Sequence, residues 1–238
     1  MTDGRFSPMI GGLVFDKDGT LFDFNATWGA WSRLMLVSEA RGDPDLLQTL
    51  ATALGYDLQG DRFRPGSLVI AEPVDVIADT ILTVTGQTDR AGLTARMNEA
   101  ARAVPQQHAA DLPALTARLR GMGLTLGVAT NDAEKSALRH LSDAGIDKDF
   151  VFVAGYDSGH GSKPAPGQLL AFCAQTGLDP TACAMIGDST HDLAAGRAAG
   201  MATVGVLTGP APRAELATLA DAVLDSVADL PDWLASRV

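Results

Sequence analysis

The sequence predicts an α/β fold, in which a doubly wound and mainly parallel sheet carries an inserted α-helical domain. In the C-terminal half, short apolar runs alternate with segments of helical spacing, as in parallel βαβ units with helices on both faces of a sheet. Residues 24–107 contain no strong strand run and are helix-like, which indicates an insertion after the first strand. We therefore expect a core of residues 1–23 and 108–238 and a helical cap of residues 24–107.

Each element is expected where an apolar run or a helical period is bounded by turn residues. The first strand is expected at 13–15, where Leu-Val-Phe ends abruptly in Asp-Lys-Asp-Gly-Thr. The cap is expected to hold helices at 25–41, 43–55, 73–86 and 91–104, separated by Gly, Pro and Asp. The later strands are expected at 124–130, 150–155, 182–188, 202–208 and 222–227, with helices at 132–145, 166–177, 191–200 and 211–219 between them.

Composition excludes several classes of partner. The net charge of −11 argues against electrostatic binding to duplex nucleic acid or to an anionic membrane, although a bound cation still allows a small anionic substrate. No run approaches the roughly 18 apolar residues of a membrane span, and the N-terminus has no apolar signal core. Cys173 and Cys183 lie in apolar runs without metal-ligand spacing, so we expect reduced core thiols and a cytoplasmic protein.

Polar residues follow the expected strands at their carboxyl ends, where α/β sheets bind ligands. They are Asp16 and Asp18 after the first strand, Thr130 at the end of the second, Lys163 after the third, and Asp188 and Asp192 after the fourth. Carboxylates gathered without a metal repel one another, and a hard cation such as Mg²⁺ removes that repulsion. A carboxylate at such a position can form an aspartyl-phosphate, while a hydroxyl, backbone N–H groups and a lysine hold the phosphoryl oxygens.

Four segments, DKDGTL, ATN, SKPAP and GDSTHD, resemble in order the four motifs of the haloacid dehalogenase superfamily. The pattern is similar to its phosphoglycolate-phosphatase-like branch, which carries a helical cap between the first and second motifs on a Rossmann-like core. The resemblance covers residues 10–22 and 110–210, whereas the insertion matches only in position, length and helical character.

The resemblance implies a role for each motif residue. Asp16 is implied as the nucleophile and Asp18 as the general acid and base. The implied Mg²⁺ ligands are Asp16, the backbone carbonyl of Asp18, and Asp188; the implied phosphate binders are Thr130 and Lys163; Asp192 is implied to orient Lys163 or a metal-bound water. Asn131 either helps to bind phosphate or caps the following helix.

The second aspartate favours a phosphatase, because a dehalogenase has no alkoxide leaving group to protonate. The phosphonate-cleaving branch uses a cap lysine, and residues 24–107 contain none. The expected function is therefore Mg²⁺-dependent hydrolysis of a small organic phosphomonoester, with 2-phosphoglycolate implied by the branch. A sugar-phosphate mutase and a non-catalytic binding protein on the same scaffold stay open.

For several side chains the sequence allows two interpretations. Arg62 and Arg64, in GDRFRPG, are either candidates for binding an acidic part of the substrate or solvated loop arginines. Trp28 and Trp31 either pack in a helical core or line the substrate cavity. Lys17 is expected to point away from the nucleophile, because alternate residues of an extended segment face opposite sides; pointing inward, it would add a second cation near the phosphate.

The histidines are weaker candidates. His191 is expected at the surface where a helix starts, and His160, in a loop close to Lys163, is a candidate substrate contact. His108 and His140 carry no functional signal.

Overall fold

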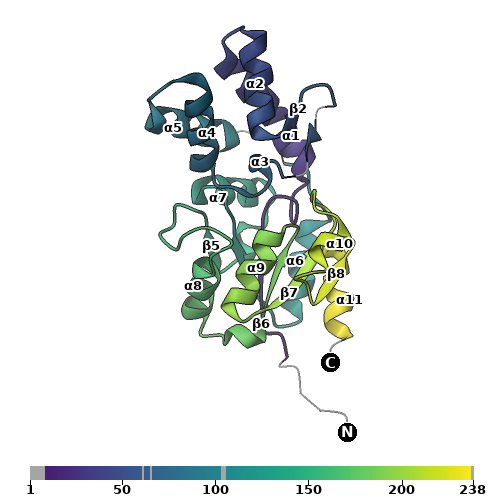
Figure 1. The fold of residues 1–238 in the computed structure, drawn as a ribbon. Coiled ribbons are helices and arrows are strands. Elements are labelled where there is room, and N and C mark those ends of the chain that lie inside the picture. The colour runs from purple at the N-terminus through teal and green to yellow at the C-terminus, as the bar shows by residue number, and fades with distance from the viewer. Residues whose placement is uncertain (1–8, 61, 65, 103–105, 237–238) are drawn as a thin grey trace.

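The computed structural model describes residues 9–60, 62–64, 66–102 and 106–236. Its centre is a six-stranded sheet in the order β5-β4-β1-β6-β7-β8, and every neighbouring pair is parallel (Figure 1). The strands are β1 (Gly12–Phe15), β4 (Thr125–Ala129), β5 (Phe152–Ala154), β6 (Cys183–Gly187), β7 (Ala202–Val206) and β8 (Ala222–Leu224). The parallel α/β sheet predicted from the alternating pattern is thereby confirmed.

Helices cover both faces of this sheet, which makes the fold doubly wound. One face carries α6 (Leu112–Gly121), α7 (Glu134–Asp143) and α11 (Leu230–Ala235), whose apolar residues pack with Leu13 and Phe15 of β1. The opposite face carries α8 (Gly167–Thr176) and α9 (Thr190–Ala199), which pack with Val14. Successive β1 residues thus point to opposite faces of the sheet. Both faces are apolar because helices cover both of them. The short helices α10 (Arg213–Leu216), η1 (Asp147–Asp149), η2 (Pro180–Ala182) and η3 (Val227–Asp229) complete the core.

Residues between β1 and α6 form a helical unit above the carboxyl end of the sheet (Figure 1). Its helices are α1 (Phe24–Ala40), α2 (Pro44–Leu54), α3 (Leu68–Ala71), α4 (Val74–Thr85) and α5 (Arg90–Arg102). Its buried apolar residues, from Phe24 to Ala101, form one hydrophobic cluster that is separate from the two clusters of the sheet. We call this unit the cap; its separate cluster explains how the unit can cover the sheet edge without being part of the sheet.

The cap also contains a small hairpin where the sequence indicates only a loop. Strands β2 (Tyr56–Asp57) and β3 (Arg62–Phe63) pair antiparallel, and the rings of Tyr56 and Phe63 lie 5.3 Å apart. Two residues per strand are too few to show the alternating pattern that identifies a strand. The pairing is accompanied by the contact between the buried Tyr56 ring and the partly buried Phe63 ring, which only the folded cap provides.

None of the described helices is long and apolar enough to cross a membrane. Cys173 on α8 and Cys183 on β6 are both free and buried, and their Sγ atoms lie 3.9 Å apart. Both thiols therefore belong to the apolar packing between the sheet and α8.

Candidate active site

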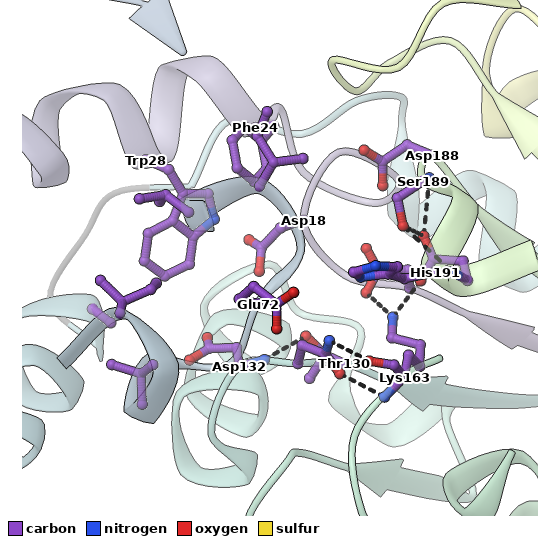
Figure 2. Close-up of a pocket in the computed structure, with 18 of the residues that line it drawn as sticks. Asp18, Phe24, Trp28, Glu72, Thr130, Asp132, Lys163, Asp188, Ser189 and His191 are labelled. Carbon is purple, nitrogen blue, oxygen red and sulfur yellow. Dashed lines mark hydrogen bonds and ion pairs between the residues drawn. The ribbon is translucent and has the colours of Figure 1, made fainter. Parts of the chain in front are cut away.

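A cavity lies between the carboxyl edge of the sheet and the cap (Figure 2). The core contributes Asp16, Asp18, Thr130, Asn131, Asp132, Lys163, Asp188, Ser189, His191 and Asp192 to its wall. The cap contributes Phe24, Trp28, Trp31, Val69, Ile70, Glu72, Val74, Ile77, Asn98 and Ala101. The structure thus brings together all of the motif residues that the sequence places after separate strands.

The parallel hydrogen-bond ladder holds these residues at one edge. The backbone N–H of Asp16 donates to the Ile186 carbonyl at 2.8 Å, and that of Thr130 donates to the Ala154 carbonyl at 2.9 Å. The residues that directly follow β1 and β4 are therefore still hydrogen-bonded to a neighbouring strand, which fixes the backbone from which the Asp16 and Thr130 side chains extend.

Asp16 and Lys163 form the centre of the site. Lys163 Nζ lies 2.6 Å from Asp16 Oδ1 and 2.6 Å from Asp192 Oδ1, and all three side chains are buried. The second oxygen of Asp192 accepts from the backbone N–H and the hydroxyl of Ser189 at the start of α9. The helix terminus thus fixes Asp192, Asp192 fixes Lys163, and Lys163 in turn contacts the predicted nucleophile.

Burial and like charge shift the pKa values of this cluster. Burial raises the pKa of Asp16 to about 7, against the opposing effect of Lys163. Burial, together with the Asp16 and Asp192 carboxylates, raises the pKa of Asp188 well above its usual range. Burial lowers the pKa of Lys163, but Asp16 and Asp192 outweigh that effect and the net shift is upward. The cluster therefore carries more carboxylate than one ammonium group can neutralise.

This donor set fits a divalent cation. Asp16, Asp188 and Asp192 each offer a carboxylate oxygen, and these oxygens all lie within 4.8 Å of one another. Gly19, with φ of +80°, passes close beside Asp188, where an added Cβ would come 2.3 Å from Asp188 Oδ2. Hard oxygen ligands without an adequate counter-charge are the surroundings that Mg²⁺ prefers. The predicted Mg²⁺ site is therefore compatible with the residues present.

Lys17 occupies a second buried charge cluster behind Asp18. Its Nζ lies 2.7 Å from Asp18 Oδ1, 3.3 Å from Asp132 Oδ2 and 3.1 Å from His140 Nδ1. The other ring nitrogen of His140 lies 3.1 Å from the Ala101 carbonyl on α5, so this cluster joins the core to the cap. The ammonium group contacts the predicted general acid rather than the predicted nucleophile.

Burial also shifts the pKa values of the groups in this second cluster. Burial and the nearby Lys17 ammonium lower the pKa of His140 to about 4, so the imidazole is neutral at pH 7. Burial lowers the pKa of Lys17, but Asp18 and Asp132 outweigh it and the net shift is upward. Burial raises the pKa of Asp132 despite the opposing effect of Lys17.

Thr130 and Asn131 are positioned by the loops around them. The Thr130 hydroxyl accepts from the Asp132 N–H at 3.0 Å, and the Thr130 carbonyl accepts from Gln168 Nε2 at 3.0 Å. The Asn131 amide accepts from the Lys163 backbone N–H at 2.9 Å and donates to the Lys163 carbonyl at 3.0 Å. Asn131 does not cap the next helix: the residue at the N-cap of α7 is Ala133, with no side-chain cap. Its amide instead fastens the Lys163 loop.

The structure places the candidate tryptophans, arginines and histidines at different distances from the cavity. Trp28 and Trp31 do both things that the sequence allows: they pack edge-to-face, with ring centroids 5.2 Å apart, within the cap cluster, and they also line the cavity. Arg64 is exposed and lies outside the cavity wall, and the Arg62 side chain lies outside the described residues. His191 lines the cavity, whereas His160 is exposed.

Sequence reasoning misses Asp132, His140, Gln168 and Glu72. Asp132 follows the ATN motif directly and could have been found as a third acidic residue at a strand end. His140, Gln168 and Glu72 carry no sequence signal, because each reaches the site from inside a helix or from a cap segment distant in sequence. Figure 2 shows the Glu72 carboxylate turned toward the middle of the cavity, between the side chains of the core and those of the cap.

Comparison with known proteins identifies the family. A family model described as haloacid dehalogenase-like hydrolase matches residues 10–200. The probable phosphatase IndB of Dickeya dadantii (strain 3937) is 29 % identical over 204 residues, which cover 83 % of this chain and 81 % of that protein. A phosphoglycolate phosphatase of Yersinia pestis is 29 % identical over 232 residues, which cover 93 % of this chain and 91 % of that one.

The fold agrees with solved structures. A predicted phosphoglycolate phosphatase from Haemophilus somnus 129PT superposes with a TM-score of 0.72 at 21 % identity, covering 97 % of this chain and 99 % of that one. At that identity the likeness concerns the fold, including the cap above the sheet. Together with the family match over residues 10–200, it identifies this chain as an enzyme of the haloacid dehalogenase-like hydrolase family.

Proposed function

We propose that this hydrolase is a Mg²⁺-dependent phosphatase that releases phosphate from a small organic phosphomonoester through an aspartyl-phosphate at Asp16. The observation that carries the proposal is the environment of Asp16, which is buried, lies 2.6 Å from Lys163 Nζ, and shares a carboxylate cluster with Asp188. The names of the relatives, a probable phosphatase and a phosphoglycolate phosphatase, support it and make 2-phosphoglycolate one candidate substrate.

The proposed reaction has two steps. In the first, an Asp16 oxygen attacks phosphorus while the bond from phosphorus to the alcohol oxygen breaks, and protonated Asp18 gives its proton to that oxygen. In the second, the Asp18 carboxylate takes a proton from a water that attacks phosphorus. The bond between Asp16 and phosphorus then breaks, which returns free Asp16, protonated Asp18 and inorganic phosphate.

The remaining residues of the core wall hold charge and position. Lys163, fixed by Asp192, offers a positive charge beside the nucleophile, and Thr130 offers a hydroxyl to the phosphoryl oxygens. Asp16, the Asp18 backbone carbonyl and Asp188 would hold Mg²⁺, which when bound supplies positive charge to the carboxylates and to the phosphoryl oxygens. The proposal includes a cytoplasmic location, with which the two free cysteines agree.

The test is phosphate release from p-nitrophenyl phosphate with Mg²⁺ by the wild type and by Asp16→Asn. We expect kcat to fall by on the order of 10³ or more, because the covalent step loses its nucleophile. Asp232→Asn is the matched control, since Asp232 is 84 % exposed and lies outside the cavity wall. Near-wild-type kcat in a folded Asp16→Asn protein would refute the covalent mechanism.

Two further arms complete this test. Chelation should abolish phosphate release and added Mg²⁺ should restore it, and full activity in excess chelator would refute the metal requirement. A sugar-phosphate mutase would isomerise a sugar phosphate without net release, so free phosphate in stoichiometric amounts excludes that alternative.

A further inference from the structure

The cap side of the cavity differs in chemistry from the core side. Three aromatic rings, those of Phe24, Trp28 and Trp31, face the cavity together with aliphatic side chains such as Val69 and Ile77. Glu72 and Asn98 are the polar exceptions among the described cap residues of this wall. The part of the substrate beyond the phosphoryl group therefore meets apolar surface, one carboxylate and one amide.

Two polar acceptors on this side, the Glu72 carboxylate and Asn98 Oδ1, have no protein partner among the residues that the structure describes. The Glu72 carboxylate makes no hydrogen bond or ion pair there, and it faces the cavity (Figure 2). Asn98 donates to the Tyr156 hydroxyl at 3.2 Å, but its buried Oδ1 accepts no hydrogen bond from any described residue. A buried acceptor without a donor is costly, which applies to Asn98 Oδ1, whereas the Glu72 carboxylate is partly buried and open to the cavity. Both oxygens are therefore placed to accept from a ligand that brings N–H groups.

No cation from the cap reaches this wall within the described residues. Four of the arginine side chains that the structure describes in the cap are engaged elsewhere: Arg90 pairs with Asp79, Arg96 with Glu39, Arg41 with Gln87, and Arg33 with the Leu58 carbonyl. Arg64 is exposed and outside the wall. Among the cap side chains that the structure describes, a carboxylate on the substrate would thus find no positive partner, and it would face Glu72.

We propose that the enzyme selects phosphomonoesters whose alcohol has an apolar body and carries an amine, and that Glu72 recognises the cationic nitrogen. This inference rests on the proposed phosphatase function and adds the substrate class. The buried indole N–H groups of Trp28 and Trp31 have no acceptor within the part of the chain that the structure describes. They are neutral donors, which suit an ester or hydroxyl oxygen of the same alcohol and require no negative charge.

The experiment compares kcat/KM for three esters of similar size that differ in charge. Phosphoethanolamine carries an ammonium group, propyl phosphate is neutral beyond its phosphate, and 2-phosphoglycolate carries a carboxylate. We expect the wild type to prefer phosphoethanolamine over 2-phosphoglycolate by about tenfold or more, with propyl phosphate between them, the scale of one charge-assisted contact. We also expect benzyl phosphate to exceed ethyl phosphate, because its ring contacts the aromatic wall.

Glu72→Gln keeps the shape of the side chain and removes its charge. We expect it to lower the ratio of kcat/KM for phosphoethanolamine to that for propyl phosphate by about tenfold. Glu215→Gln is the matched control, because it removes the same charge from the exposed surface of α10 and should leave this ratio unchanged. A ratio unaltered by Glu72→Gln, or a wild-type preference for 2-phosphoglycolate over propyl phosphate, would overturn the proposal.

Failure of the substrate class is distinguishable from failure of the function. A wild type that releases no phosphate from p-nitrophenyl phosphate or any other ester in the presence of Mg²⁺ contradicts the proposed function itself. A wild type that hydrolyses p-nitrophenyl phosphate but prefers the carboxylate ester contradicts only the amine selectivity.

Discussion

The core wall and the cap wall of the cavity use polar groups in opposite ways. On the core wall, Asp16 and Asp192 both lie 2.6 Å from Lys163, and Asp18 lies 2.7 Å from Lys17. On the cap wall, the Glu72 carboxylate and the Asn98 Oδ1 have no partner within the described part of the chain. On the core wall these carboxylates and lysines are paired with one another before any substrate binds, although His191 Nδ1 has no partner among the described residues. The cap wall leaves its two carboxylate and amide acceptors open.

The difference follows from what each wall has to bind. A phosphoryl group is the same in every substrate, so fixed donors and charges can be arranged for it in advance. The alcohol differs from one ester to another, and its recognition depends on groups that gain their partner only from the ligand. The ion pairs on the core wall therefore position groups for catalysis on the phosphoryl group. The open acceptors on the cap wall allow the enzyme to discriminate between substrate alcohols.

Asp18→Asn gives the largest expected effect of the changes that probe this comparison. As general acid and then base, Asp18 should contribute roughly 10²- to 10⁴-fold to kcat. The loss should be greater for an alkyl phosphate than for p-nitrophenyl phosphate, because the alkoxide needs protonation and the nitrophenolate does not. Steady-state kinetics on both esters measure it; equal losses would show that Asp18 does not protonate the leaving group.

Lys17→Met tests whether the second lysine holds the core wall together. It leaves Asp18 and Asp132 without their ammonium partner, with side chains that are only 12 % and 6 % exposed. We expect the free energy of unfolding to fall by about 3–5 kcal/mol, and to recover in part in Lys17→Met/Asp132→Asn. Denaturant unfolding measures it, with exposed Lys135→Met as control. A loss no larger than that of Lys135→Met would show that the network does not stabilise the fold.

His140→Gln tests the link between the core and the cap as a function of pH. Because the folded-state pKa of His140 is about 4, below the ordinary 6.5, the neutral ring stabilises the fold above pH 6.5 and this contribution is lost as pH falls toward 4. The advantage of the wild type over the variant should therefore shrink by up to about 3 kcal/mol between pH 7 and pH 4. Unfolding curves at several pH values measure it.

The control for this pH series is His160→Gln, because His160 is exposed and outside the cavity wall. Its difference from the wild type should stay nearly constant over the same range. A constant difference for His140→Gln as well would mean that His140 is not held neutral by its surroundings.

Arg64→Ala should have the smallest effect. An exposed arginine outside the cavity should change KM for 2-phosphoglycolate by less than about twofold, since solvated charges contribute little. A clear rise in KM for this ester, with no change for p-nitrophenyl phosphate, would instead support the carboxylate-binding role that the sequence suggests for GDRFRPG and would weaken the contrast between the two walls.

The sequence alone predicted the α/β core, the helical cap and the acidic edge of the sheet. Short apolar runs that end in polar residues mark buried parallel strands, and the carboxyl ends of such strands lie on one edge. Asp16, Thr130 and Asp188 could therefore be placed together without coordinates. The hairpin at Tyr56 and Phe63 could not be predicted, because strands of two residues are too short to show an alternation of apolar and polar residues.

Tertiary structure alone decided which groups pair and which stay open. Lys17 and His140 are 123 positions apart, and their contact exists because α7 packs beneath the cap at the edge of the sheet. Glu72 reaches the cavity from a cap segment that no motif marks. Local patterns determine where strands and helices form because backbone and burial preferences are local. The partner of a charged side chain depends on elements brought together by burial of apolar surface, and no local pattern carries that information.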